Sequence, residues 1–390
     1  MKNFDFSVPT KVLFGEGKLN ELKDYLGNMG KKGLLVTGKS SMRKTGVLDR
    51  VIKLGKESGV EIIVNEGVEP NPTSDYINHM SKLVRKEGCD FLIGLGGGSP
   101  MDAAKAISLL AINDGVIEDY LPGGKYEDMA NVLGALPIVA ITTTAGTGSE
   151  VTMFSVITNK KTKEKPGIGH QCLFPVLSII DPELMVSVPK HITLSTGVDV
   201  LFHALEAYIC TVATPLTDMY ALEAIKLVLE NLGDVLEDGS NLEKRSKVAW
   251  ANTLAGMAIV QASTVGIHGM GHPIGGHTNS PHGMTMAALG KAFLDKTYDG
   301  DIDRYSNITK ILGYDCEGLS KKECAAKSGE ALQRVLDRFG AHVTISDLGV
   351  KEDMIETLAK DAFKTMGGCM AVSLKELDVE DAISIYKSSL

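Results

Sequence analysis

The chain has 390 residues, of which 44% are hydrophobic, and a formal net charge of −9. This length is enough for two domains with separate cores, and the composition is that of an ordinary globular protein rather than a disordered one. Lysine and arginine are scattered among the acidic residues without a basic stripe. Neither nucleic acid nor an anionic membrane is therefore an expected partner.

The six cysteines lie far apart and form no C-x-x-C pair, a pattern that predicts free thiols in a reducing compartment. The N-terminus lacks the apolar core of a signal peptide, and no run approaches the ~20 apolar residues of a membrane span. We therefore expect a cytoplasmic protein.

The first part of the chain alternates short apolar runs with amphipathic stretches. A strand with a glycine turn into a helix, at 11–26, is expected to be an edge strand or a dimer contact. Runs that are apolar on both faces are typical of buried strands in a parallel sheet. They follow at 31–38, 59–67, 88–98, 136–144 and 176–182. Helical patterns such as 41–59 and 73–88 separate them, so we predict a doubly wound, Rossmann-like α/β domain.

After about residue 186 the strand signals stop. Long patterns with a period of 3.6 residues predict an all-helical second domain. They lie at 195–211, 217–238, 242–262 and 322–340. Two prolines in IIDPELMVSVPKH break regular structure where the pattern changes, so the predicted domains are 1–186 and 187–390.

The segment FLIGLGGGSPMDAAKAI predicts a strand, a triple glycine turn and a helix. Ser99 is the expected N-cap and Pro100 the first helical residue, with Asp102 three residues after the cap. The bare N-terminus of such a helix suits a pyrophosphate. The spacing is not G-x-G-x-x-G, so a tight turn with a capping box and no ligand explains this motif equally well.

A second loop strengthens the case for a phosphorylated ligand. The segment AITTTAGTGSEVT passes from a buried strand directly into hydroxyl groups and glycines. Open α/β sheets bind ligands at the carboxyl ends of their strands. The residues concerned are Thr142, Thr143, Thr144, Gly146, Thr147 and Gly148.

Residue 38 bears on which dinucleotide would bind. Enzymes that use the unphosphorylated cofactor commonly offer a carboxylate to the adenosine ribose at the end of a strand. Here Gly38 stands at that place, followed by Lys39, Ser40, Ser41 and Arg43, and no carboxylate is expected there to repel a 2′-phosphate. The same run could also be an ordinary polar loop.

Asp199 and His203 are four residues apart in a predicted helix, so they share one face of it. Their neighbours are apolar almost all round, and a buried Asp and His require a reason. A hydrogen-bonded structural pair is one explanation and a metal site is the other.

The stretch GIHGMGHPIGGHTNSPHG, 266–283, holds four histidines. His268 and His272 are four residues apart, and His282 and His277 follow in the same stretch. Three imidazoles and one carboxylate suit a divalent first-row ion such as Fe²⁺ or Zn²⁺. Since Asp199 and His203 are candidates as well, not all four clustered histidines can be ligands.

These motifs are similar to those of the iron-containing (group III) alcohol dehydrogenases, over nearly the whole chain. The shared motifs are VPTKVLFGEGKLNEL, PNPT, GGGSPMDAAK, TTTAGTGSEVT, DPELM, GVDVLFHALEAY, HGMGHPIGGHTNSPHG and ISDLGV. The resemblance implies metal ligands at Asp199, His203, His268 and His282, for Fe²⁺ or else Zn²⁺ or another divalent ion. His272 would be the unbound histidine near the nicotinamide, a candidate proton relay. Cofactor contacts would fall on Asn71, Gly97, Gly98, Ser99, Asp102, Thr143, Thr144, Thr147 and Lys165.

Within that family, members preferring NAD carry an aspartate where this chain has Gly38, and the NADPH-dependent butanol dehydrogenases do not. The resemblance therefore implies an alcohol dehydrogenase or aldehyde reductase using NADP(H) and a primary, butanol-like alcohol or aldehyde. Ser40 and Ser41 would lie near the 2′-phosphate, with Lys39 or Arg43 close by. The nicotinamide would sit in an interdomain cleft, and the chain would form a homodimer or a higher homo-oligomer.

Three alternatives remain open from the sequence. The same architecture resembles glycerol dehydrogenases and dehydroquinate synthases, and an NAD-preferring diol dehydrogenase would share the motifs. A non-catalytic nucleotide-binding protein would leave the candidate ligand set unexplained. His277 could line the substrate cleft or be an ordinary loop histidine. The segment 367–376 departs from the family pattern, so its local role is open.

Overall fold

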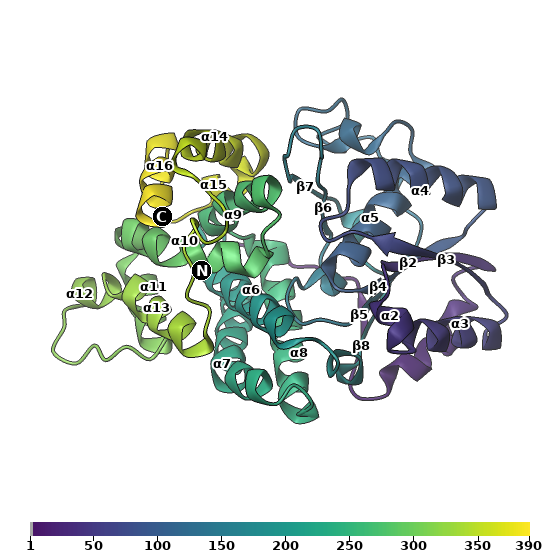
Figure 1. The fold of residues 1–390 in the computed structure, drawn as a ribbon, viewed down its shortest axis with the longest axis horizontal. Coiled ribbons are helices and arrows are strands. Elements are labelled where there is room, and N and C mark those ends of the chain that lie inside the picture. Colours follow the sequence, from purple (N-terminus) through teal and green to yellow (C-terminus); the bar gives the residue numbers. More distant parts are fainter. Residues whose placement is uncertain (1–2) are drawn as a thin grey trace. The chain divides into compact units, whose positions relative to one another are not determined.

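The structure is a computed structural model that describes residues 3–390, and their contacts divide them into two compact units (Figure 1). The α/β unit comprises Ser7–Thr162 and Pro166–Val188. The helical unit comprises the chain up to Phe6, then Lys163–Lys165 and Pro189–Leu390. The short segment 163–165 lies inside the range expected for the first domain, but it clusters with the helical unit.

The α/β unit is built on a six-stranded sheet in which all pairs are parallel, in the order β1-β8-β5-β4-β2-β3. The strands are β1 Lys11–Phe14, β2 Lys32–Gly38, β3 Glu61–Val68, β4 Phe91–Gly96, β5 Ile138–Thr142 and β8 Leu177–Ile180. The expected edge strand is confirmed, since β1 pairs only with β8. The predicted parallel α/β sheet is therefore present.

The strand β3 corrects one expectation. It lies at the other edge of the sheet and is mostly half-buried, whereas β4 is buried throughout. An edge strand has a neighbour on one side only, and its apolar run does not reveal this. The sequence also missed a two-stranded antiparallel pair, β6 Phe154–Val156 and β7 Gly167–Gly169, because three residues are too few to show a period.

Helices cover both faces of the sheet, as a doubly wound fold requires. One core packs residues of α4 and α5 on the sheet, and the other packs residues of α1 and α3. The predicted helix at 41–59 is divided at Gly46, whose φ is 75°. The helical segments are η1 Lys18–Leu22, α1 Lys23–Leu26, α2 Ser41–Lys44, α3 Val47–Glu57, α4 Ser74–Glu87, α5 Gly98–Ile112, η2 Ile117–Tyr120, η3 Ser149–Val151, η4 Gln171–Leu173 and η5 Pro182–Met185.

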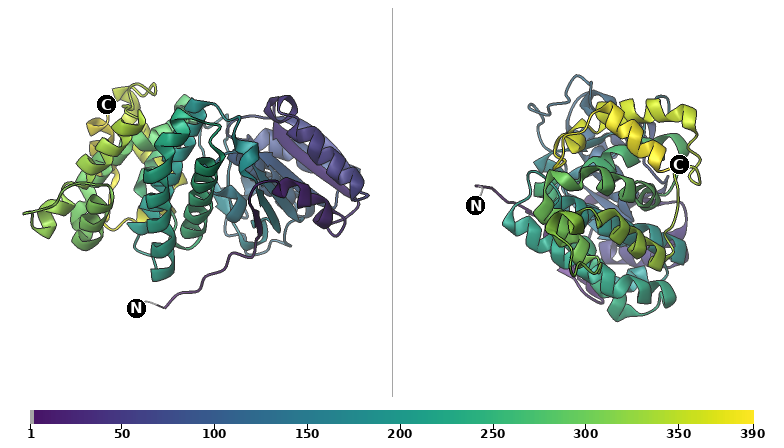
Figure 2. Two further views of the ribbon diagram at one scale, coloured as in Figure 1. Left: turned by 90° about the horizontal axis from the view of Figure 1, so that it is seen from below. Right: turned by 90° about the vertical axis from the view of Figure 1, so that its left-hand side faces the viewer.

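The helical unit has no strand in residues 189–390, only an isolated bridge, so its predicted class is confirmed. The helices α6, α7 and α8 pack side by side, in teal and green in Figure 2. No helix among residues 3–390 combines the length and apolarity that crossing a bilayer needs. The segments are α6 Lys190–Tyr208, α7 Pro215–Glu237, α8 Leu242–Ala262, α9 Gly266–Thr278, α10 His282–Thr297, η6 Tyr298–Gly300, α11 Ile302–Ile311, α12 Lys321–Ala325, α13 Ser328–Phe339, η7 Glu352–Met354, α14 Ile355–Thr365, α15 Gly367–Ala371 and α16 Val379–Ser388.

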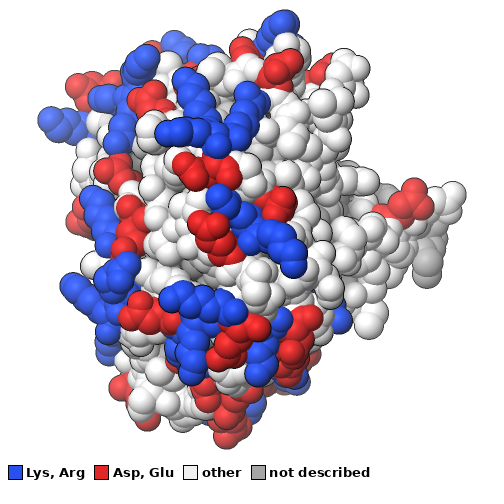
Figure 3. All heavy atoms as spheres, turned by 90° about the vertical axis from the view of Figure 1, so that its right-hand side faces the viewer, with Lys and Arg blue, Asp and Glu red and all other residues white. Residues whose placement is uncertain are grey.

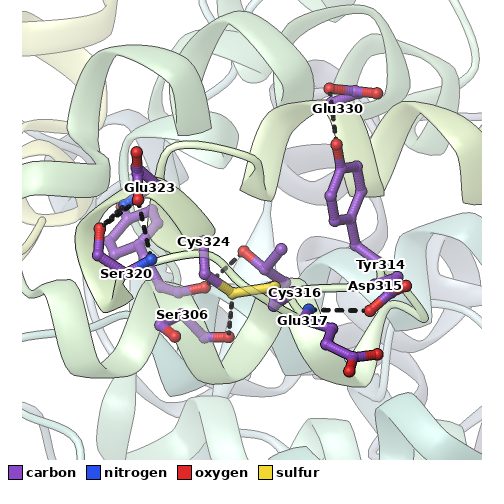
Figure 4. The surroundings of a disulfide bond; sticks show 11 residues. Ser306, Tyr314, Asp315, Cys316, Glu317, Ser320, Glu323, Cys324 and Glu330 are labelled. Atoms are coloured by element: carbon purple, nitrogen blue, oxygen red, sulfur yellow. Dashed lines mark hydrogen bonds between the residues drawn. A yellow bond between two sulfur atoms is a disulfide. The ribbon is translucent and has the colours of Figure 1, made fainter.

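The expectation of free thiols is wrong for one pair of cysteines. Cys316 and Cys324 form a disulfide across the turn between α11 and α12 (Figure 4). The turn passes through Gly313 and Gly318, both with positive φ, and brings the two Cα atoms to 5.6 Å. A spacing of eight residues does not reveal such a turn. The other four cysteines are free.

Charged side chains of both signs are interspersed over the face of the molecule drawn in Figure 3. This distribution agrees with the scattered charges of the sequence.

Candidate functional site

The glycine-rich and threonine-rich loops lie side by side at the carboxyl edge of the sheet. They follow β4 and β5, which are hydrogen-bonded neighbours, and the Thr143 N–H donates to the Gly96 carbonyl at 2.8 Å. The end of β2, at Gly38, adjoins β4 on its other side. The sequence-predicted loops are therefore adjacent, in the place where open α/β sheets bind ligands.

Glycine is required in the β4 loop by close packing. A Cβ on Gly97 would lie 3.1 Å from Thr144 Oγ1, and one on Gly98 would lie 2.6 Å from Thr147 Cγ2. Within β4 itself, a Cβ on Gly94 would lie 2.8 Å from the Met101 Cα. The glycines thus allow the two loops and α5 to approach the same point closely.

The expected N-cap of α5 is wrong by two residues. The helix begins at Gly98 with Gly97 as its N-cap, and no side chain caps it. The Ser99 hydroxyl instead accepts a hydrogen bond from the Asn71 N–H at 3.2 Å. Asn71 has a φ of 61°, so a left-handed residue joins the loop after β3 to the start of α5.

Asp102 and Lys105 hold the chain that follows the threonine loop. The Asp102 carboxylate accepts from the Ser149 hydroxyl at 2.7 Å and the Val156 N–H at 3.0 Å. Lys105 is fully buried, and its ammonium donates to the Ser149 carbonyl and hydroxyl, both at 2.7 Å. Burial lowers the pKa of Lys105 to about 8. Sequence reasoning missed Lys105, although a lysine within AAKAISLLA is an available signal.

The surroundings of Gly38 correct another expectation, because carboxylates do lie near this end of the sheet. Glu66, paired with Thr37 across β2 and β3, accepts from Arg43 at 2.6 Å. Glu69 lies 3.9 Å from the Lys39 ammonium. The sequence missed both acids because Glu66 lies in the neighbouring strand β3 and Glu69 just after it, so neither is close to residue 38 in the chain.

Three of the four predicted metal ligands converge in the helical unit. One donor atom from each of Asp199, His268 and His282 lies within 4.8 Å of the others. Asp199 Oδ1 is 3.6 Å from His268 Nε2 and 3.8 Å from His282 Nε2. They come from three helices, α6, α9 and α10.

The donor atoms fit a bound cation. Asp199 Oδ1, His268 Nε2 and His282 Nδ1 are buried without a hydrogen-bond partner among the described residues. Buried polar atoms without partners are costly, and a divalent ion beside Asp199 Oδ1 and His268 Nε2 would satisfy these two. One carboxylate and two imidazoles suit borderline ions such as Fe²⁺ or Zn²⁺.

His203 lies beside this group but outside it. Its ring stacks on that of His268, with centroids 4.6 Å apart and an interplanar angle of 24°. The structure therefore brings His203 to the site without placing its nitrogens among the converging donor atoms.

His268 is the most strongly anchored of the three candidate ligands. Its Nδ1 lies 2.5 Å from the Glu206 carboxylate, a residue that the sequence analysis did not single out. Burial lowers the pKa of His268, but the Glu206 and Asp199 carboxylates outweigh burial and raise it to about 9. A signal for Glu206 was available, because it is an acid within the mainly apolar stretch VLFHALEAY, three residues after His203.

His272 is close to the converging group but has a different partner. Its Nδ1–H donates to the Lys165 carbonyl at 3.0 Å, which leaves the lone pair on Nε2. Its ring centroid is 4.9 Å from that of His282. Burial lowers the pKa of His272 well below its ordinary value, so the ring is neutral near pH 7. Lys165, a predicted cofactor contact, belongs to the helical unit and lies beside α9.

The helix α9 that carries His268 and His272 is an unusual helix. It contains five glycines and Pro273 in thirteen residues. A Cβ on Gly269 would lie 2.6 Å from Met370 Sδ, and one on Gly271 would lie 3.0 Å from Thr285 Oγ1. The glycines allow α10 and α15 to approach α9 closely, so its neighbours impose the helix despite its sequence.

Contacts of α9 show where His277 and the segment 367–376 lie. His277 lies in the last turn of α9, not in a loop, and its Nε2 is 2.9 Å from Asp361 Oδ2 in α14. The unusual segment 367–376 packs on the other end of α9, where the Ser373 hydroxyl accepts from the Gly266 N–H at 3.2 Å. The structure therefore places this segment against the helix that carries His268 and His272.

Comparison with known families and proteins covers nearly the whole chain. Residues 9–182 match the family described as iron-containing alcohol dehydrogenase, and residues 193–390 match its C-terminal family. An NAD-dependent methanol dehydrogenase of Bacillus methanolicus is 34% identical, over 99% of this chain and 100% of the relative. A 1,3-propanediol dehydrogenase of Citrobacter freundii is 38% identical, over 93% of this chain and 92% of the relative.

Among solved structures, an NADH-dependent butanol dehydrogenase A of Thermotoga maritima has a TM-score of 0.91. It is 30% identical, and the match covers 99% of this chain and 98% of that one. These relatives are named for different alcohols, so they support the family but not the expected subgroup of NADPH-dependent butanol dehydrogenases. This chain belongs to the iron-containing alcohol dehydrogenase family of NAD(P)-dependent oxidoreductases.

Proposed function

We propose that this enzyme transfers hydride between NADP(H) and a primary alcohol or its aldehyde, of the size of butanol. The observation that carries its metal dependence is the convergence of donor atoms from Asp199, His268 and His282, of which Asp199 Oδ1 and His268 Nε2 are buried without a hydrogen-bond partner among the described residues. We propose His203 as the fourth ligand, since its ring already stacks on that of His268. Fe²⁺ is the proposed ion, and Zn²⁺ or another divalent ion fits the same donors.

A bound divalent ion would supply Lewis acidity, polarising the oxygen of the alcohol or aldehyde. The chain's own residues perform the remaining tasks. The uncapped N-terminus of α5 offers N–H groups to a pyrophosphate. The lone pair on His272 Nε2 can take up the hydroxyl proton during alcohol oxidation, and the resulting N–H returns it during aldehyde reduction.

The proposed cofactor contacts lie mainly at the carboxyl edge of the sheet. The loops after β4 and β5 meet there, and the Ser99–Asn71 hydrogen bond joins a third loop to them. Lys165 is a further proposed contact. The proposed residues are Gly38, Ser40, Ser41, Asn71, Gly97, Gly98, Ser99, Asp102, Thr143, Thr144, Thr147 and Lys165.

The test of this function is metal-dependent consumption of NADPH. The full chain, purified without oxygen, is assayed with butyraldehyde after its metal has been removed and again after Fe²⁺ or Zn²⁺ has been restored. We expect activity only with metal, because aldehyde polarisation requires the ion. No consumption with butyraldehyde or any other aldehyde, whatever metal is present, would reject the proposal.

The proposed preference for NADP(H) rests on the absence of a side chain at Gly38 and on the neighbouring Ser40 and Ser41 hydroxyls. A specific observation supports the alternative of an NAD-preferring alcohol or diol dehydrogenase. The Glu66 carboxylate forms an ion pair with the Arg43 guanidinium. Arg43 could therefore bind a 2′-phosphate only if this ion pair were broken. Kinetics with both cofactors distinguish the alternatives.

The Gly38→Asp variant should reverse the preference. The structure has room for the side chain, since a Cβ on Gly38 would meet only the Val68 carbonyl, at 4.0 Å. The new carboxylate would repel a 2′-phosphate and accept from ribose hydroxyls, so the ratio of kcat/KM for NADPH to that for NADH should fall on the order of 100-fold. Gly38→Asn is the matched control, because it has the same size without the charge. An equal fall in both variants would show that the effect is steric.

A homodimer or a higher homo-oligomer remains the proposed assembly. Among the described residues β1 is an edge strand with β8 as its neighbour, and an edge strand is a common place for another copy to add a strand.

A further inference from the structure

Glu206 is a fully buried carboxylate in α6. An unpaired charge at such a position would be very costly. Three N–H groups compensate for it. Oε2 accepts from the Val265 N–H at 2.7 Å and the His268 N–H at 3.2 Å, and Oε1 lies 2.5 Å from His268 Nδ1. All three donors belong to the start of α9 or to the residue before it.

The Oε2 atom of Glu206 serves as the N-terminal cap of α9. The N-cap of α9 is Val265, which has no side chain able to accept a hydrogen bond. Glu206, which lies in α6, supplies the missing acceptor through Oε2. The Ser373 hydroxyl accepts from the Gly266 N–H at 3.2 Å. The start of this glycine-rich helix is therefore fixed by two side chains from other segments.

The second oxygen fixes the ring of His268. A carboxylate accepts the hydrogen bond from Nδ1–H, so the neutral form of the ring, which is the form that binds a metal ion, carries its proton on Nδ1. The lone pair then lies on Nε2, the buried atom that has no hydrogen-bond partner among the described residues and lies 3.6 Å from Asp199 Oδ1. Hydrogen bonds of this kind orient metal-binding histidines and select their tautomer.

We propose that Glu206 is the positioning residue of the metal centre. Its two oxygens place the start of α9 and, independently, set the orientation and tautomer of His268. The inference rests on the proposed metal site, and it adds a residue that does not itself touch the ion or the substrate.

Glutamine tests this role because it has nearly the same shape but only one acceptor. The backbone N–H groups of Val265 and His268 can act only as hydrogen-bond donors. The imidazole, in contrast, can move its proton from Nδ1 to Nε2 and so become an acceptor at Nδ1. In Glu206→Gln the amide oxygen should therefore face the backbone, and the amide NH₂ should face His268 Nδ1. This arrangement favours the wrong tautomer and removes the lone pair from Nε2.

The experiment measures the Kd for Zn²⁺ by competition with a chromophoric chelator, using the metal-free full chain. We expect a 10–100-fold weaker Kd for Glu206→Gln, the usual effect of losing such a partner. The Co²⁺-loaded variant should also show a shifted visible absorption band at saturation. Ser373→Ala is the matched control, because it removes the other cap of α9 without contacting His268. It should lower stability and leave the Kd unchanged.

The inference is overturned if Glu206→Gln binds Zn²⁺ as tightly as the unaltered chain, or if Ser373→Ala weakens binding equally. The latter result would mean that anchoring α9 is the whole effect. If the glutamine variant does not fold, Glu206→Asp, which keeps the charge on a shorter stem, is judged by the same two criteria. Failure of the unaltered chain to bind Zn²⁺, Co²⁺ or Fe²⁺ would instead reject the metal site of the proposed function.

Discussion

Replacing Gly283 by alanine should destabilise the protein severely and disrupt the proposed metal site. Gly283 follows His282 at the start of α10, and a Cβ there would overlap the Ser195 carbonyl of α6 and lie 3.2 Å from the Asp199 N atom. The obstacles are backbone atoms, which cannot rotate away as a side chain can. Overpacking typically costs about 1–3 kcal/mol and occasionally more, and we expect the upper end here. Urea denaturation of the metal-free protein measures the change in the free energy of unfolding.

The matched control is the same substitution at a position with open space. Gly233 lies within α7, and an added Cβ would meet nothing within 4 Å. Alanine there should stabilise the protein by roughly 0.5–1 kcal/mol, because glycine loses more backbone entropy in a helix. Equal effects of the two substitutions would show that the contact between α6 and α10 does not limit stability.

His272→Ala should reduce kcat by about 10²- to 10⁴-fold while the protein keeps its metal. The Nδ1–H of His272 is bound to the Lys165 carbonyl and its pKa is lowered by burial, so it is a neutral ring with a free lone pair on Nε2. The loss should be largest at pH values where proton transfer limits the rate. Steady-state kinetics across pH, with metal content from emission spectroscopy, give both quantities.

His277→Ala is the comparison for this experiment. His277 lies on the same helix, is hydrogen-bonded to Asp361 and is not one of the converging residues. Its removal should leave kcat almost unchanged. Loss of metal in His272→Ala would mean that His272 is a ligand and not a proton relay.

The parts of the fold that follow from local patterns were predictable. The run 88–98 is apolar on both faces and does form a central buried strand, β4, followed by a glycine turn and a helix. The spacing of Asp199 and His203 placed them on one helix, and the structure has them on α6. These features depend on residues that are close in the sequence.

Other features depend on residues brought together only by folding. Glu66 reaches Arg43 because β3 pairs with β2, and no pattern around residue 38 indicates it. Glu206 reaches the start of α9 across some sixty residues of chain. The N-cap of α5 was misplaced because local rules favour a serine, whereas Thr144 and Thr147 pack against Gly97 and Gly98.

The composition of α9 makes this helix depend on its neighbours for stability. Each glycine costs a helix about 1 kcal/mol relative to alanine, and an internal proline costs about 3 kcal/mol. With five glycines and Pro273, the segment would be a coil on its own. Packing against α10, α14 and α15 therefore stabilises its helical state. Loosening any of these neighbours would melt the segment that carries His268, so the metal centre reports the integrity of the whole unit as well as that of its ligands.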